Sequence, residues 1–529
     1  MLRNPLYVYG DGAVNVPAHL NFGQFILEKL WNNEDKIAMI NGSTHQKITY
    51  RDMAKSCINI ALSLTQMGVK KGDMIAICSE NRQEFISLAI GIICSGATIT
   101  PTNPAYTKDE LTYVLNISKP KMMFCSPLAY KTHKQTFKNL RFMKIVLFGN
   151  ERLRGTLSYE DMVRDRGINF DTFESVHVTG QKDTALILYS SGTTGFPKGV
   201  MLTHLNLLTT CSVAPTVNPK ETGLYIAPWY HTMGIMSILR VLCSGSTTIY
   251  LPKFGITEYL QTIEKYRVDY IVVPPPVLVI LSKTESNYDI SSLKLIISGA
   301  APLREEIIKA VKAKFPNVKN ILQGYGMTES TLAVTRDTYD KAHSAKGVGQ
   351  IVTGNVIKVV DIETRKPLGT NKPGEICVKG PTVMKGYIGK NKKDDFDEEG
   401  FFKTGDIGYY DEDGYFFIVD RLKELIKYKG YQVAPAEIEA VLLQHPSIQD
   451  AGVVGVPHES GGEAPRAFVV IQPGANVTEE EVKNFVAEKL SNPKHLRGGV
   501  RFVSEIPKNP SGKILRRKLK RMAKLTSKL

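Results

Sequence analysis

A short polar loop with the sequence SSGTTGFPKGV, residues 190–200, directly follows the apolar run TALILY. Its hydroxyl side chains, three glycines and one lysine, Lys198, could surround a polyphosphate. A glycine-rich turn after a buried strand lets backbone N–H groups approach phosphate oxygens, and the lysine adds positive charge. No Gly-Lys-Ser/Thr sequence closes the loop, so it is not a Walker A motif. By itself the pattern fits either a phosphate site or a polar surface loop.

Further segments carry residues that could act on a phosphate, a sugar or a carboxylate. They are QGYGMTEST (323–331), FFKTGD (401–406), VDRLKELIKYKGYQVAPAEIE (419–439) and PKNPSGKILRRKL (507–519). Taken singly, Asp406 could cap a turn, Glu329 could pair with a surface lysine and Tyr325 could lie in the core. In this order, and together with the loop, the segments resemble those of the adenylate-forming superfamily, which contains acyl-CoA synthetases, coumarate–CoA ligases and beetle luciferases. The resemblance extends over essentially the whole chain.

The resemblance implies a reaction in two steps. A carboxylate attacks the α-phosphate of ATP and forms an acyl-adenylate and pyrophosphate. Coenzyme A then attacks the activated carbonyl and AMP leaves. A carboxylate is a poor electrophile, and adenylation converts its oxygen into a good leaving group. The implied ligands are therefore ATP, Mg²⁺, coenzyme A and a small-molecule carboxylic acid.

The resemblance also assigns roles to single residues. The loop would hold the β- and γ-phosphates through Ser190, Ser191, Gly192, Thr193, Thr194, Gly195 and Lys198. Thr328 would contact phosphate, and Glu329 would help to place Mg²⁺, a hard ion suited to carboxylate and phosphate oxygens. The adenine would stack on Tyr325, in a pocket formed with Gly299, Ala300, Gln323, Gly324 and Gly326. Asp406 would accept hydrogen bonds from the ribose hydroxyls, with Arg421 beside it.

Two lysines are expected to serve the two half-reactions. By the resemblance, Lys513 in the PSGKI turn reaches the adenylation centre and stabilises the charge that develops on phosphorus. Lys427 would act in thioester formation after a small domain rotates about Asp420. Each could also be an ordinary exposed lysine, because only the flanking residues distinguish it.

The acid is expected to bind after the segment APWYHTMGIMSIL. The family places a histidine, here His231, near the substrate carboxylate, although a lone histidine could also lie in the core. The expected acid pocket comprises His231, Thr232, Met233, Ala300 and Leu332. Trp229, Met236 and the segment VVPPPVLVIL offer further apolar lining, but most of these positions are expected in the core.

The phrases IKYKGYQVAPAE, LQHP and LRGGV resemble beetle luciferases and their non-luminous relatives. Three positions depart from luciferases: Met233 replaces an aromatic residue, Leu332 a serine, and Ala300 a glycine. A flexible apolar lining favours an alkyl chain, because each buried methylene contributes roughly 0.8 kcal/mol. We therefore expect a medium- or long-chain fatty acid first and a hydroxycinnamate second. Luciferin oxidation with light, and a non-catalytic nucleotide-binding protein, are the alternatives.

Elements that could position these residues follow a clear pattern. Between about residues 70 and 335, β-branched runs such as MIAIC, ALILYS and KLIISG alternate with helical patterns such as KDELTYVLNIS and EYLQTIEKY. This alternation predicts an α/β fold with largely parallel, buried strands. After Gly347, glycine- and aspartate-rich turns predict antiparallel strands and a β-barrel-like subdomain. We place the domain boundary at Asp420-Arg421, between an adenylation domain, residues 1–420, and a small mobile α+β domain, residues 421–529.

Composition excludes some classes of protein. The seven cysteines show no zinc spacing, and their odd number argues against a disulfide framework. The apolar segment from Phe85 falls short of the roughly 20 residues of a membrane span, so a buried helix followed by a strand is expected. The amino-terminal residues have no apolar signal core, so secretion is not expected.

The net charge of +15 at pH 7 and a basic carboxy-terminal segment could bind nucleic acid non-specifically. No nucleic-acid-reading module accompanies them. A solvated basic face is the favoured interpretation, and nucleic acid is not an expected partner. The residues Ser527, Lys528 and Leu529 form the peroxisomal address SKL. They predict a peroxisomal location and binding to the import receptor.

Overall fold

The computed structural model describes the following residues: 3–12, 14–140, 144–149, 151–167, 170–190, 197–213, 217–285, 287–301, 303, 305–338, 347–428, 431–458, 462–509 and 512–525. The chain divides into two compact units. Unit 1 comprises Met1–Val8, Ile357–Cys377 and Lys403–Leu529, and unit 2 comprises Tyr9–Val356 and Val378–Phe402. The Asp420-Arg421 junction lies inside unit 1, so the predicted domain boundary stays a prediction.

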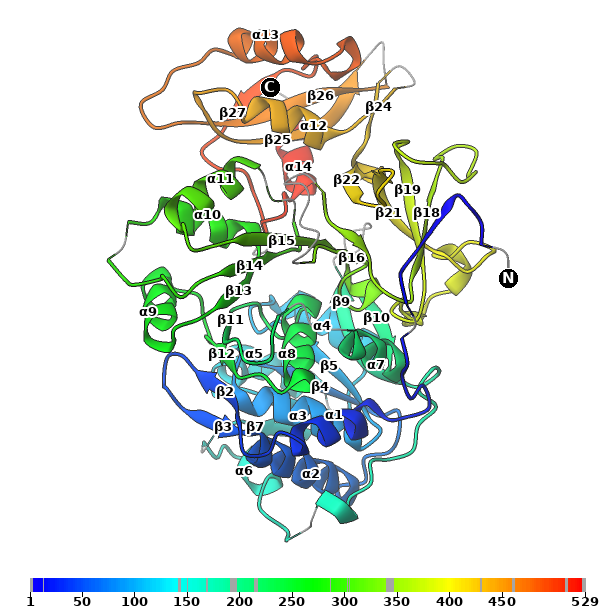
Figure 1. The fold of residues 1–529 in the computed structure, drawn as a ribbon, viewed down its shortest axis with the longest axis vertical. Coiled ribbons are helices and arrows are strands. Elements are labelled where there is room, and N and C mark those ends of the chain that lie inside the picture. The colour runs from blue at the N-terminus through cyan, green and yellow to red at the C-terminus, as the bar shows by residue number, and fades with distance from the viewer. Residues whose placement is uncertain are drawn as a thin grey trace. The chain divides into compact units, whose positions relative to one another are not determined.

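Unit 2 contains two mixed sheets (Figure 1). In spatial order, the β9 sheet consists of β20 (Gly386–Tyr387), β10 (Lys198–Thr203), β9 (Thr184–Ser190), β5 (Thr98–Thr102), β4 (Met74–Cys78), β6 (Met122–Cys125), β7 (Lys144–Leu147) and β8 (Leu157–Ser158). The β15 sheet consists of β17 (Gln350–Ile351), β16 (Thr335–Arg336), β15 (Asn320–Tyr325), β14 (Leu295–Ser298), β13 (Tyr270–Val273), β11 (Gly223–Tyr225), β12 (Thr248–Tyr250), β2 (Ile37–Asn41) and β3 (Lys47–Thr49).

The helices of unit 2 connect these strands. They are α1 (Phe22–Trp31), α2 (Tyr50–Gln66), α3 (Gln83–Cys94), α4 (Lys108–Ser118), α5 (Pro127–Asn139), α6 (Tyr159–Met162), α7 (His204–Ser212), α8 (Thr232–Ser244), α9 (Ile256–Tyr266), α10 (Pro275–Lys283) and α11 (Glu305–Lys314), with the 3₁₀ turns η1 (Phe170–Thr172), η2 (Thr328–Ser330) and η4 (Lys392–Asp394). Strands β4, β5, β6 and β7 pair in parallel, as do β11 to β14 with β15. The predicted α/β fold is confirmed.

Local sequence explains several of these elements. The helix α4 begins where Thr107 and Glu110 form a reciprocal capping box. The apolar segment from Phe85 forms α3, buried on all sides from Phe85 to Cys94, and then β5. This is the buried helix and strand expected in place of a membrane span. No helix within the described ranges is long and apolar enough to cross a membrane.

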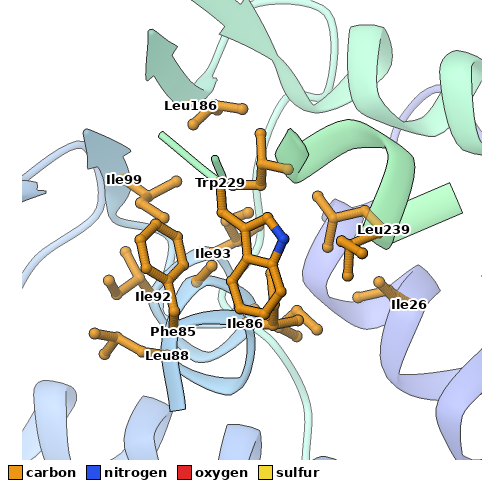
Figure 2. Packing of buried hydrophobic residues seen from close by; sticks show 14 of the residues in the cluster. Ile26, Phe85, Ile86, Leu88, Ile92, Ile93, Ile99, Leu186, Trp229 and Leu239 are labelled. Carbon is orange, nitrogen blue, oxygen red and sulfur yellow. The ribbon is translucent and has the colours of Figure 1, made fainter. Parts of the chain in front are cut away.

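The core beside α3 and α8 shows why most apolar residues of the predicted acid segment do not bind ligand. Trp229 is 1% exposed, and its ring lies 5.8 Å from that of Phe85 at an interplanar angle of 74°. Figure 2 shows the indole among Ile86, Ile93 and Leu239. Met236 is also fully buried. Both therefore stabilise the fold, as expected for most positions of this segment.

Unit 1 contains a five-stranded sheet and an α+β region. The β21 sheet consists of β1 (Tyr7–Tyr9), β18 (Val356–Val360), β19 (Gly374–Lys379), β21 (Phe402–Tyr410) and β22 (Phe416–Arg421). The β25 sheet consists of β24 (Tyr431–Val433), β23 (Ile426–Tyr428), β26 (Gly462–Ile471), β25 (Ile448–His458) and β27 (Val500–Phe502). Its helices are α12 (Pro435–Leu442), α13 (Glu479–Lys489) and α14 (Arg516–Leu525), with the 3₁₀ turns η5 (Leu422–Glu424) and η6 (Asn492–Lys494).

Six cysteines are buried and Cys243 is partly buried, all as free thiols. The predicted role of most cysteines as small buried residues is confirmed.

Candidate active site

The predicted adenine-binding segment lies at the end of β15. Gly324 and Tyr325 pair with Arg336 and Thr335 of β16, and Gln323 pairs with Ser298 of β14. A side chain at Gly326 would meet the carbonyl oxygen of Leu332 at 1.8 Å. Only glycine therefore allows the chain to turn back on itself here.

The turn after β15 carries Thr328 and Glu329 on η2 and ends at Thr331, which has φ of +68°. Such a backbone is costly for a β-branched residue and persists only where its surroundings hold it. The Thr331 hydroxyl donates to the carbonyl of Thr382 at 2.5 Å, and the Thr331 carbonyl accepts from the Thr232 hydroxyl at 2.6 Å. The turn is thereby fixed to the first residue of α8.

A tyrosine joins the predicted phosphate lysine to the predicted metal-binding carboxylate. The Tyr387 hydroxyl donates to Glu329 Oε1 at 2.8 Å, and Lys198 Nζ lies 4.4 Å from the centroid of the Tyr387 ring. Lys198 Nζ is also 4.0 Å from Asp395 Oδ1. The structure therefore brings Lys198 and Glu329 together, although they are far apart in the sequence.

The loop itself is described only at its ends. Ser191, Gly192, Thr193, Thr194 and Gly195 lie outside the described residues. Ser190 ends β9, and its hydroxyl is buried with no hydrogen-bond partner among the described residues. An unsatisfied buried hydroxyl costs free energy, so a ligand oxygen here would stabilise the site.

The predicted Mg²⁺ site offers a carboxylate donor. Mg²⁺ is usually held by one or two carboxylates together with substrate phosphates. Glu329 is 8% exposed and supplies one carboxylate beside the loop. No group of three or more His, Cys, Asp or Glu side chains suited to a metal lies in the described part of the chain. The residues thus fit an ion that arrives with a nucleotide.

One cavity of about 530 Å³ brings most of the predicted nucleotide and acid residues together. The predicted residues that line it are Gly299, Ala300, Gln323, Gly324, Tyr325, Gly326, Thr232, Met233 and Leu332. Its size lies within the usual range for small-molecule sites. Ala300, where luciferases have glycine, adopts φ of +72°, a conformation that glycine adopts more easily.

His231 is not among the described lining residues, but it directly precedes one. It occupies the N-cap position of α8, and its ring lies 4.7 Å from that of Tyr230. The residue is exposed on the surface, and partial desolvation by the neighbouring protein atoms lowers the pKa of the imidazole. The ring is therefore neutral at pH 7 and available as a hydrogen-bonding group.

The sequence interpretation missed the charged part of the cavity wall. Lys29, Arg240, Arg336 and Asp337 line the cavity together with the predicted apolar residues. The sequence did contain a pattern that could have indicated this polar wall, because polar residues recur on one face of the otherwise apolar helix α8. That face consists of Ser237, Arg240 and Ser244.

In unit 1, β21 and β22 place the predicted ribose-binding pair side by side. Asp406 pairs with Arg421 in the strand register, and Arg421 Nε lies 2.9 Å from Asp406 Oδ1. Asp406 is buried, whereas Arg421 is partly exposed. The carboxylate oxygens of Asp406 are acceptors that can bind hydroxyl groups.

The charges of Asp406 and Arg421 both act on the side chain of Lys513. Burial, followed by the charge of Arg421, lowers the pKa of Lys513 to about 8, while Glu424 and Asp406 act in the opposite direction. Its backbone N–H donates to Asn509 Oδ1 at 2.8 Å, which fixes the turn. Lys427 lies on β23 and is exposed. Unit 1 therefore holds Lys513, but not Lys427, in a desolvated position close to Asp406 and Arg421.

A buried ion network connects the Lys513 turn to the predicted hinge. Arg516 pairs with Glu424 and Glu439, in each case at 3.0 Å. Asp420 accepts hydrogen bonds from the backbone N–H groups of Arg421 and Ala436. Burial raises the pKa of Asp420, and the charge of Arg516 opposes the rise. The first residue of α14 is thus held by the residues around Asp420.

Comparison with known proteins identifies the family. A family model described as an AMP-binding enzyme matches residues 28–388, and one described as an AMP-binding enzyme C-terminal domain matches residues 437–513. Luciferin 4-monooxygenase of Nipponoluciola cruciata is 42% identical over 506 residues, covering 92% of this chain and 91% of that protein.

A probable CoA ligase of Humulus lupulus is 40% identical over 510 residues, covering 93% of this chain and 91% of that protein. The crystal structure of ATP-bound MatB from Rhodopseudomonas palustris matches with a TM-score of 0.85 and 30% identity, covering 96% of this chain and 99% of that one. The resemblance inferred from the motifs is confirmed, and the chain belongs to the AMP-binding, adenylate-forming enzymes.

Proposed function

We propose that this protein is an AMP-forming acid–CoA ligase. It activates a medium- or long-chain fatty acid with ATP and transfers the acyl group to coenzyme A. The observation that carries the proposal is a shared cavity: Tyr325 and Gly326, expected to bind nucleotide, line the same space as Met233 and Leu332, expected to bind the acid. Two reactants held side by side react without the entropic cost of a bimolecular encounter.

The roles of the residues follow from their chemistry. Lys198 and the hydroxyl of Ser190 would hold the β- and γ-phosphates, with Thr328 beside them. Glu329, oriented by Tyr387, would hold Mg²⁺, which when bound offsets phosphate charge. The neutral imidazole of His231 would orient the acid carboxylate at the start of α8.

Unit 1 would supply the remaining groups. Asp406 and Arg421 would bind the ribose hydroxyls, and Lys513 would stabilise the negative charge that grows during adenylate formation. Lys427 is exposed on a different strand, β23, which supports a separate role in the thioester step. In this proposal, rotation about Asp420 brings Lys513 to the reaction centre for adenylation and Lys427 for thioester formation.

A second candidate activity is light-producing oxidation of luciferin, favoured by the 42% identity to luciferin 4-monooxygenase. One experiment separates the two. The protein is given ATP, Mg²⁺ and coenzyme A with fatty acids, hydroxycinnamates or luciferin, and AMP, acyl-CoA and photons are measured together. Acyl-CoA formed from a fatty acid with little light supports the ligase. A photon yield from luciferin that matches the thioester yield from every acid contradicts it.

The cell location is a separate proposal. Ser527, Lys528 and Leu529 would bind the peroxisomal import receptor. They lie outside the described residues. A fluorescent fusion that ends in these three residues should enter peroxisomes, and one without them should not.

A further inference from the structure

The helix α8 presents charge and hydroxyl groups to the acid-binding cavity. Met233, Ser237, Arg240 and Ser244 line it at spacings of four, three and four residues, which places them on one face of the helix. Ile238 and Leu239, on other faces of the helix, are buried in the core, whereas Val241 and Cys243 also line the cavity. An arginine on the inner face of such a helix requires desolvation of its charge, which is costly unless an anion or hydrogen-bond acceptors offset it.

Arg240 lies far along α8 from the reaction centre. The first residue of the helix, Thr232, is hydrogen-bonded to Thr331, which ends the turn that carries Thr328 and Glu329. Eight residues at 1.5 Å each place Arg240 about 12 Å further along the helix axis. The guanidinium is therefore suited to contact the distal end of a bound acid, away from the carboxylate that is adenylated.

A second arginine reaches the same region from the β15 sheet. Arg336 of β16 lines the cavity, and both arginines also border a small adjoining cavity of about 20 Å³. Burial, followed by the charge of Arg240, lowers the pKa of Arg336 to about 10. The two guanidinium charges repel one another, and an anion bound in contact with both would stabilise both.

The remaining charged lining residues leave this region positive. Lys29 of α1 is a third cation on the wall, and its charge acts on the neighbouring Cys243. The one described carboxylate on the wall, Asp337, accepts a hydrogen bond from the backbone N–H of Gln323 at 2.9 Å. Three cations therefore face the cavity with one carboxylate.

We propose that the acid activated by this protein carries a second carboxylate at its far end, and that Arg240 and Arg336 bind it. The substrate class is then an aliphatic α,ω-dicarboxylic acid, whose methylene chain contacts Met233 and Leu332. This inference rests on the proposed ligase function and specifies its substrate. Paired guanidinium groups are well suited to a carboxylate because they offer several donors in fixed planes.

The test compares acids that differ only at the distal end. Pyrophosphate release is measured with octanoate against octanedioate and with decanoate against decanedioate. We expect kcat/KM for the diacid to exceed that for the monoacid at least tenfold, because only the diacid adds a charge-assisted contact between its distal carboxylate and the two guanidinium groups. In Arg240→Leu and in Arg336→Met this ratio should fall by about a hundredfold or more, and Arg240→Lys should restore part of it. Arg164→Leu, which removes an exposed arginine paired with Asp161, is the charge-matched control.

Binding is measured in parallel by the shift in melting temperature with each acid, which needs no catalysis and also shows whether each variant folds. A wild-type ratio of one or less, or a ratio unchanged in both arginine variants, overturns the proposal. A third outcome separates the two proposals. If no acid supports pyrophosphate release, and if decanedioate alone raises the melting temperature of the wild type but not that of Arg240→Leu, then the diacid site is supported and the ligase function is refuted. If neither release nor stabilisation occurs, both fail.

Discussion

Replacing Lys513 with methionine tests whether a desolvated lysine drives adenylate formation. The pKa of Lys513 falls from its ordinary 10.5 to about 8, chiefly through burial. At about 1.4 kcal/mol per pH unit, this difference corresponds to about 3 kcal/mol. Below pH 8 the lysine is charged in the folded and the unfolded chain, so folding carries this full cost. As the pH rises from 8 to 10.5, the folded-state lysine becomes neutral first and the cost disappears.

Lys513→Met should therefore be at least as stable as the wild type at pH 7, with a difference in the free energy of unfolding of up to about 3 kcal/mol that vanishes above pH 10.5. Pyrophosphate release should fall by about 10²- to 10³-fold, the loss typical of removing one charge-stabilising group. Thioester formation from a supplied acyl-adenylate should be retained.

The pH profile gives a further readout. In the wild type, kcat/KM for adenylation should decrease above about pH 8, because kcat/KM reports the pKa of the free enzyme. Lys513→Arg retains its charge and should lose this decrease, and Lys518→Met, at an exposed lysine on α14, is the control. Equal loss of both half-reactions in Lys513→Met, or a marked loss of stability at pH 7, would refute the reasoning.

Three other changes have definite expected outcomes. Ala300→Gly should raise the free energy of unfolding by about 1 kcal/mol. The φ of +72° costs alanine about 1–2 kcal/mol, and the larger conformational entropy of glycine in the unfolded chain cancels part of the gain from removing this cost. An unchanged or lower denaturation midpoint would contradict this. Tyr387→Phe removes the hydroxyl that donates to Glu329, so adenylation should need a higher Mg²⁺ concentration, and an unaltered Mg²⁺ titration would exclude the orienting role. Arg516→Met leaves Glu424 and Glu439 without their buried cation and should destabilise the protein by about 3–5 kcal/mol at pH 7. The loss should be smaller at acidic pH, where carboxyl groups are protonated. Calorimetry of both proteins at the two pH values shows whether the difference in stability decreases as predicted.

Local patterns predicted much of the fold. The run MIAIC became β4, ALILYS became β9 and KDELTYVLNIS became α4, because hydrophobic period and capping residues act over a few positions. The parallel arrangement also followed from the alternation of helices and strands. The site residues came from the resemblance, and the cavity that unites Tyr325 with Met233 agrees with it.

The sequence could not predict the charged wall. Arg240 lies on a helix and Arg336 on a short strand in a different part of the chain, and only tertiary packing places both at one cavity. A lone arginine in a sequence is indistinguishable from the many that lie on the surface. The same holds for Tyr387, which no motif contains and which joins Lys198 to Glu329.

The central claim is that one cavity holds nucleotide and acid together so that the carboxylate attacks phosphorus. Acid-dependent exchange of labelled pyrophosphate into ATP measures this step directly and needs no coenzyme A. The account predicts exchange with wild-type protein when a matching acid is supplied, and a loss of about 10²-fold or more in Lys513→Met. Absence of exchange with every carboxylic acid, mono- or dicarboxylic, would contradict it.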